Sequence, residues 1–198
     1  MEADGCAIYS GIIKSMPDDI ILRFHAALPK VAAWMEGYLK AHAASARQVS
    51  ALGFKRLPLY FPINLLEGSK VVSVDRVPYP PVESFGLPEF ASMQQMSFSG
   101  ITFKDTFFIQ RGLESEESLH FHELVHVVQW ARLGIHKFLL AYGLGLHAFG
   151  YERSPLETMA FGLQQEFASG RPLSNLVQLI EQSTDTVWSR AAQLLQTP

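Results

Sequence analysis

The most regular hydrophobic pattern of the chain lies between Ser115 and Gly134, where apolar side chains occur on nearly every face of a predicted helix. Ser115 can cap this helix, the acidic residues that follow suit its positive end, and Gly134 suits the position just past its last turn. A helix that is apolar nearly all round is a buried central element. Its apolar positions are Leu119, Phe121, Leu124, Val125, Val127, Val128, Trp130 and Leu133.

Other patterns along the chain predict strands first and further helices afterwards. Segments 70–75 and 101–109 are rich in β-branched and aromatic residues and indicate strands, and a stiff proline-rich loop over 77–81 follows the first of them. Helical patterns start at Pro17, where they indicate a short helix, and cover 29–48, 156–168 and 174–196. We therefore expect an α+β fold in which a small mixed or antiparallel sheet packs against the central helix and the C-terminal helices.

Length and apolar content predict one domain over residues 1–198. The chain is 48% apolar and has no linker or low-complexity tract, so it can form one substantial core. Within this domain we expect an N-terminal helical region over 1–50, a strand-rich region over 54–110 and a helical region over 115–198.

The central helix carries the sequence His122-Glu123-Leu124-Val125-His126, which is the H-E-x-x-H spacing of zinc hydrolases. Residues four apart on a helix are neighbours, so both imidazoles can bind one tetrahedral zinc ion at about 2.0–2.1 Å. Glu123 is displaced around the helix and can act as a general base towards water. The alternative is a pair of hydrogen-bonded core histidines with Glu123 reaching solvent.

A catalytic zinc site needs a third protein ligand, and the residues downstream offer several. Gln129 and Arg132 stand where the metzincin pattern requires glycine and histidine, so that class is excluded. The remaining candidates are His136, His147, Glu152, Glu157 and Glu166.

Glu157 is the best placed of these candidates because it lies in the first turn of a predicted helix, with Ser154 as cap and Pro155 as first residue. Spacing alone leaves a second interpretation open. Ser154 and Glu157 also form an S-x-x-E capping box, in which the glutamate only bonds the backbone of the cap.

The segments His122–Gln129 and Ser154–Ala160 together resemble the gluzincin metallopeptidases, and look closest to small bacterial proteins with a minimal metallopeptidase domain. The resemblance covers about 101–160, and serine replaces the usual asparagine at position 154. It implies a minimal zincin-like lobe, zinc bound by His122, His126 and Glu157, and Glu123 as general base. It also implies that the strand at 101–109 borders the substrate cleft, whereas the residues alone indicate only a core or hairpin strand.

A hydrolase also needs a donor that stabilises the developing oxyanion, for which gluzincins use tyrosine or histidine. Tyr142, His147 and Tyr151 lie between the two motif helices, and we expect Tyr151 to take this role because it is near Glu157 in the sequence. Residues that orient the ligand histidines should exist as well, with candidates Asp105, Glu152, Glu166 and Asp185. We expect His25, His42 and His120 not to be ligands.

Charge, cysteine content and the lack of signal segments predict which partners, zinc sites and location to expect. The net charge is −3 without a basic stripe, so we expect no nucleic-acid partner. The only cysteine is Cys6, which predicts neither a disulfide framework nor a cysteine zinc site. We see no secretion signal and no membrane-spanning segment, and expect a cytoplasmic protein.

The sequence therefore predicts a zinc-dependent hydrolase, expected to be a peptidase that acts on a peptide or protein substrate. One alternative is a zincin fold that binds zinc or a partner without catalysis. Another alternative is a zinc hydrolase that cleaves amides other than peptides. The sequence leaves cleavage specificity and oligomeric state open.

Overall fold

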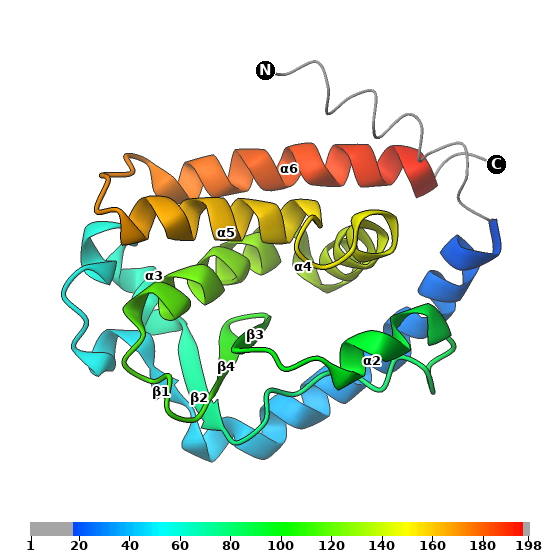
Figure 1. Cartoon of the computed structure of the whole chain (residues 1–198), viewed down its shortest axis with the longest axis horizontal. Coiled ribbons are helices and arrows are strands. Elements are labelled where there is room, and N and C mark those ends of the chain that lie inside the picture. Colours follow the sequence, from blue (N-terminus) through cyan, green and yellow to red (C-terminus); the bar gives the residue numbers. More distant parts are fainter. Residues whose placement is uncertain (1–17, 196–198) are drawn as a thin grey trace.

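The structure, a computed structural model, describes residues 18–195 and has an α+β fold. Cys6 lies outside these residues. Figure 1 shows a small sheet with α4, α5 and α6 to one side of it and α2 to the other. The α-helices are α2 (Asp18–His42), α3 (Ile63–Gly68), α4 (Glu117–Phe149), α5 (Pro155–Ala168) and α6 (Leu176–Leu195). The 3-10 helices are η1 (Ala43–Ser45), η2 (Val49–Leu52), η3 (Leu57–Leu59) and η4 (Pro88–Gln95).

The sheet is mixed and has the strand order β1-β2-β4-β3. Its strands are β1 (Arg47–Gln48), β2 (Lys70–Val74), β3 (Gly100–Phe103) and β4 (Thr106–Gln110). The central pair, β2 and β4, is parallel, and the outer strands β1 and β3 each pair antiparallel with their neighbour. The predicted α+β class with a small mixed sheet is confirmed.

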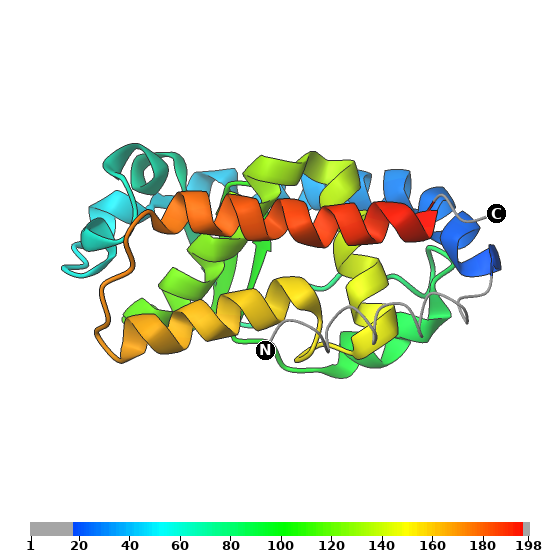
Figure 2. The same ribbon diagram turned by 90° about the horizontal axis from the view of Figure 1, so that it is seen from above.

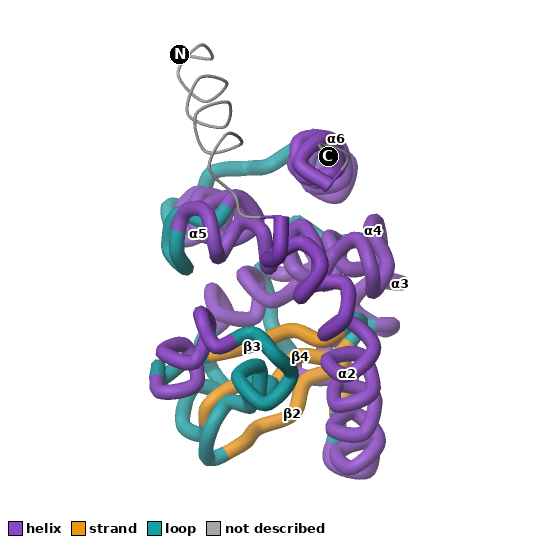
Figure 3. Tube along the Cα trace, turned by 90° about the vertical axis from the view of Figure 1, so that its right-hand side faces the viewer, coloured by secondary structure: helices purple, strands orange, loops and turns teal. Residues whose placement is uncertain are grey.

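Both faces of the sheet are covered, and the alternation of side chains along the strands decides what each face contacts. Phe107 and Val71 pair across the parallel strands and point towards Phe121 and Leu124 of α4. Phe108 points to the opposite face, where its ring meets Tyr38 of α2. In the side view of Figure 3, α5 and α6 lie above the strands and α2 lies beside them. The strands are hydrophobic on both faces because both faces are packed.

The N-terminal helical region differs from the prediction of two helices. Residues 18–42 form the single helix α2, which continues through Pro29, and the predicted end at position 48 is wrong because residues 47–48 form β1. A proline inside a helix removes one hydrogen bond, but the buried stripe continues past it at helical spacing. This stripe consists of Ile20, Phe24, Ala27, Val31 and Met35. Burial of one continuous face outweighs the missing bond.

The single strand predicted over 101–109 is a hairpin. β3 and β4 pair with Phe103 opposite Thr106, so Lys104 and Asp105 form a two-residue turn. Lys104 has a φ of 62°, a left-handed conformation that is uncommon for a non-glycine residue. The turn was missed because it contains neither glycine nor asparagine, the usual residues of such hairpins. The strand predicted over 70–75 is confirmed to within one residue as β2.

Helix α4 has a kink at Gly134, and Figure 2 shows that its ribbon changes direction along its length. Gly134 has φ 69° and ψ 174°, so the straight helix that begins at Glu117 ends where the sequence predicted. A second helical segment then continues to Phe149. The N-cap is Glu116 rather than the predicted Ser115, since a turn that ends with a bond from Glu116 N to Leu113 O precedes the helix.

The two C-terminal helices follow the prediction closely. α5 begins at Pro155 after the cap position Ser154, and α6 begins two residues after the predicted start. Arg132 of α4 donates two hydrogen bonds to Asp185 of α6, at 2.8 and 2.6 Å. Within residues 18–195, no helix has both the length and the apolar character that crossing a membrane requires.

Replacing Phe107 by alanine is expected to lower the free energy of unfolding by about 3–5 kcal/mol. The Phe107 side chain is fully buried between the sheet and α4, so its removal leaves a cavity that the packed neighbours cannot fill. Urea denaturation followed by circular dichroism measures the loss. Leu59→Ala is the control, because Leu59 is 79% exposed and its truncation should cost less than about 0.5 kcal/mol. Equal losses in the two variants would show that Phe107 does not pack between the sheet and α4.

Candidate metal centre

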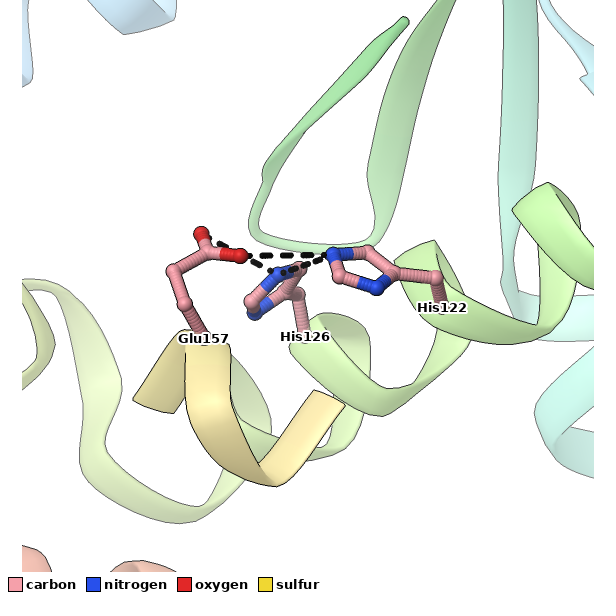
Figure 4. Close-up of side chains that lie close together, drawn as sticks. All are labelled: His122, His126 and Glu157. Carbon is pink, nitrogen blue, oxygen red and sulfur yellow. Dashed lines mark hydrogen bonds and ion pairs between the residues drawn. The ribbon is translucent and has the colours of Figure 1, made fainter. Parts of the chain in front are cut away.

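The structure brings His122, His126 and Glu157 together in one buried group that could hold a metal ion. Figure 4 shows both imidazoles extending from α4 and the carboxylate extending towards them from α5. The helical repeat aligns the two histidines one turn apart, and the packing of α5 against α4 supplies the third side chain. All three residues are at most 5% exposed.

The distances between the donor atoms suit a tetrahedral ion. The two Nε2 atoms are 3.1 Å apart, and the Glu157 oxygens lie 3.4 Å from Nε2 of His122 and 3.5 Å from Nε2 of His126. Ligand atoms at the usual zinc distances lie about 3.3 Å apart in a tetrahedron. One ion at their centre would therefore meet all three atoms without a large movement of the chain.

Gln129 holds His126 in the orientation that a metal site requires. Its amide nitrogen donates to the carbonyl of Leu156 at 3.2 Å, so its amide oxygen faces Nδ1 of His126 at 2.8 Å. A backbone carbonyl only accepts hydrogen bonds, which fixes which end of the amide faces the ring. Nδ1 of His126 therefore donates the proton of this bond, and Nε2 is the ring nitrogen at which a cation can replace a proton.

Gln164 supports the other histidine in the same way. Its amide oxygen lies 3.1 Å from Nδ1 of His122 and accepts the proton there. Gln164 stands two turns after Glu157 on α5, so one face of α5 carries both a candidate ligand and the residue that supports His122. Both imidazoles are thus held by uncharged oxygen acceptors.

The charges in this group are arranged for a cation. Burial alone would raise the pKa of Glu157, but the charge of His126 and the closeness of both imidazoles hold it well below its ordinary value. Burial alone would lower the pKa of His126, but Glu157 raises it to about 9. Glu157 Oε2 is buried without a hydrogen-bond partner in the structure. A carboxylate oxygen in this position gains a partner when a metal ion binds.

The capping-box interpretation of Glu157 is wrong. The carboxylate of Glu157 is directed at the histidines and accepts a 2.6 Å hydrogen bond from the Tyr142 hydroxyl. Ser154 occupies the N-cap position of α5 but makes no side-chain cap bond, and its hydroxyl is buried without a partner. The interaction with α4 therefore determines where Glu157 points.

Glu123 lies on the side of α4 that faces β3. One of its carboxylate oxygens accepts a 2.6 Å hydrogen bond from the hydroxyl of Thr102, and the side chain is 2% exposed. Burial raises the pKa of Glu123, and the two neighbouring histidines act in the opposite direction. A Cβ on Gly100 would come within 2.3 Å of Glu123 Oε1, so the absence of a side chain at position 100 makes room for this carboxylate.

Two tyrosines lie near His122, His126 and Glu157, which we call the metal group: Tyr142 in the second half of α4 and Tyr151 between α4 and α5. Tyr142 and Tyr151 both line the pocket that contains His122, His126 and Glu157. Burial, followed by the charge of Glu157, raises the pKa of each hydroxyl far above its ordinary value. Both hydroxyls therefore stay protonated and can donate hydrogen bonds.

The other candidates for the third ligand lie elsewhere. His136, His147 and Glu152 are exposed, and Glu166 pairs with Arg171 on the surface. His120 is buried, but its Nε2 contacts the carbonyl of Glu114 instead of the metal group, as expected for a non-ligand. His25 is exposed, and the ring of His42 stacks on Tyr38. None of these residues belongs to the metal group found within residues 18–195.

The predicted supporting residues are wrong. Asp105 lies in the β3–β4 turn, Asp185 pairs with Arg132, and Glu152 and Glu166 are on the surface. All four predicted residues are carboxylates, whereas glutamine oxygens support both histidines. Helical spacing could have indicated both glutamines. Gln129 lies three positions after His126, and Gln164 lies seven positions after Glu157, so each shares a helix face with a member of the His-His-Glu group. Thr102 gave no such signal because it reaches Glu123 across the β3–α4 contact.

Replacing Gln164 by leucine is expected to weaken zinc binding by about 10–100-fold, because the Nδ1 proton of His122 loses its acceptor. A competition titration with a chromophoric chelator measures this affinity. Gln165→Leu is the matched control, since Gln165 is the next residue of α5 and is exposed. If both variants bound zinc equally well, Gln164 would have no supporting role.

Comparison of the chain with protein-family models, with curated proteins and with solved structures gave no match. The resemblance to gluzincins therefore remains a prediction from two short segments. The structure adds to them a buried His-His-Glu group that could hold a metal ion.

Proposed function

We propose that this protein is a zinc-dependent hydrolase that attacks amide carbonyls with water, in the manner of the gluzincin peptidases that its motif resembles. The observation that carries the proposal is the tetrahedral spacing of the donor atoms of His122, His126 and Glu157. Glu123 lies beside this group in the same pocket. The arrangement combines three ligands with a carboxylate that is not a ligand.

The donor set favours zinc in a catalytic rather than a structural role. Two imidazole nitrogens and one carboxylate oxygen are a common ligand set of catalytic zinc, whereas structural sites have four protein ligands. Within residues 18–195 the group contains three residues that can bind a metal. When bound, zinc supplies a water molecule of lowered pKa and polarises the carbonyl.

Glu123 is the proposed general base. Its hydrogen bond to Thr102 orients the carboxylate from the side of β3, whereas the proposed ligand Glu157 comes from α5. Burial raises its pKa towards the range in which a carboxylate can accept a proton from water and then release it to the leaving nitrogen.

Tyr151 is the proposed donor to the oxyanion. Tyr151 lines the pocket, and its raised pKa keeps the hydroxyl protonated, as this role requires. Tyr142 has a different role because its hydroxyl donates to Glu157 Oε1. That bond orients the carboxylate of Glu157 and leaves its Oε2 directed at His122.

The direct test of this proposal combines metal content with zinc-dependent turnover. The protein is purified without a metal-affinity tag, equilibrated with zinc, and measured by inductively coupled plasma mass spectrometry. We expect about one zinc per chain, and amide hydrolysis that stops on chelation and returns with zinc. Absence of stoichiometric zinc would overturn the proposal. One bound zinc without hydrolysis of any peptide or simple amide would instead favour a non-catalytic zinc-binding protein.

A further inference from the structure

An apolar pocket of about 120 Å³ opens directly beside the metal group. The polar side chains that line it are those of the three proposed ligands, Glu123, Thr102 and three tyrosines, Tyr79, Tyr142 and Tyr151. Its apolar part comes from α2, from the segment before β3 and from the second half of α4, and includes Phe24, Ala27, Val31, Phe90, Phe138 and Leu146. Any molecule that reaches the metal group therefore meets an apolar wall on one side.

The charge of the pocket limits what this wall can accept. Among the described residues that line it, none is lysine or arginine, and the carboxylates are those of Glu123 and Glu157 in the metal group. A charged substituent would lose its hydration among these apolar side chains without gaining a partner. The pocket therefore suits an uncharged apolar group.

The size of the pocket limits which apolar group of a ligand can enter it. An apolar cavity of about 150 Å³ holds a benzene molecule, so a volume of about 120 Å³ suits a phenyl ring or a short branched alkyl chain. Ala27 contributes one of the smallest side chains in the apolar part of the lining, so a larger residue at position 27 would occupy this space.

The strand next to the metal group is poorly suited to bind a long peptide. β3 is an edge strand, but its Thr102 carbonyl accepts a 3.0 Å hydrogen bond from the Trp130 indole, and Glu123 packs against Gly100. Strand addition needs free backbone groups along such an edge. The ligand residues and Glu123 are also only 2–5% exposed, which leaves little room for a chain that passes across them.

We propose that the substrate is a compact amide that carries one uncharged apolar group, a phenyl ring or short alkyl chain, which enters the pocket beside Ala27. This inference rests on the proposed zinc hydrolase function and narrows its substrate class. A short N-acyl amide has this chemistry, and a long extended peptide does not.

Calorimetric titration of the zinc-loaded protein with hydroxamic acids tests the inference through binding alone. Acetohydroxamic acid and 3-phenylpropanohydroxamic acid share the zinc-binding group and differ in the apolar group. We expect the phenyl compound to bind about 30-fold more tightly, because its ring leaves water for the pocket. A tripeptide extension of the phenyl compound should bind no more tightly than the parent.

Substitutions at two neighbouring positions of α2 test whether the preference for the phenyl compound arises in this pocket. Ala27→Leu fills the pocket and is expected to reduce the preference for the phenyl compound below about threefold, while acetohydroxamic acid binds as before. Ala26→Leu adds the same side chain at an exposed position and should keep the full preference. Ala27→Val adds less volume and should shift the preference in the same direction, which gives a second variant if Ala27→Leu does not fold.

The outcomes separate this inference from the proposed function. Equal binding of the two small hydroxamic acids, or an unchanged preference in folded variants at position 27, would overturn the pocket assignment while zinc loading and hydrolysis still stand. Much tighter binding of the extended peptide compound would overturn the compact substrate. Failure of the protein to load zinc, measured separately, would remove the proposed function and this inference with it.

Discussion

Glu123→Gln is expected to keep one zinc per chain and to lower turnover by about 10²–10⁴-fold, the usual contribution of a general base. Glutamine has nearly the shape of glutamate and can still accept the hydrogen bond from Thr102, so the packing between α4 and β3 is retained. It cannot take a proton from water. The loss should therefore appear in kcat, with little change in zinc affinity or KM.

Glu116→Gln is the matched control for this result. Glu116 is an exposed glutamate at the N-cap of the same helix and makes no side-chain cap bond, so its substitution should leave both zinc content and turnover unchanged. Turnover of Glu123→Gln equal to that of the unchanged protein would exclude Glu123 as the base. Loss of zinc from that variant would show that Glu123 takes part in metal binding.

Glu157→Ala is expected to weaken zinc binding by more than about 100-fold, which exceeds the usual loss when only a supporting residue is removed. The substitution removes one of the three donor atoms and leaves the Tyr142 hydroxyl without its acceptor. Zinc at 100 times its Kd stabilises a folded protein by about 2.7 kcal/mol. The unchanged protein should therefore show a zinc-dependent rise in Tm that the variant lacks.

Glu157→Gln and Glu166→Ala complete this experiment. Glutamine at position 157 preserves an acceptor for Tyr142 but lacks the negative charge, so zinc affinity should still fall. Glu166 lies on the same helix in a surface pair with Arg171, and its substitution should leave the zinc-dependent rise in Tm intact. A Glu157→Ala variant that kept full zinc affinity would show that the third ligand lies elsewhere.

The sequence predicted the metal group because local rules determine most of it. Two histidines at helical spacing share a face wherever the helix forms, and Glu157 follows a clear helix start at Pro155. Whether Glu157 capped its own helix or faced α4 depended on the packing between the two helices. Spacing alone could not distinguish these possibilities.

Residues that reach the site across the fold were harder to predict. Thr102 contacts Glu123 from β3, and the segment around it was predicted as one strand instead of a hairpin. Gln129 depends on the Leu156 carbonyl, which only the docking of α5 brings near. In α2, long-range burial likewise overruled the local effect of Pro29, so one helix formed where two were predicted.

The hydrogen bond from Trp130 to Thr102 also bears on aggregation, because it lies at an edge of the sheet. An exposed edge strand can recruit a strand from another molecule, and hydrophobic strands such as β3 are the usual starting points. Here the indole occupies the Thr102 carbonyl at one edge of the sheet. The other edge, β1, is two exposed residues long and begins with the charged Arg47. One indole occupies a carbonyl of β3 and β1 is very short, so we expect the sheet to offer a poor template for intermolecular strand pairing.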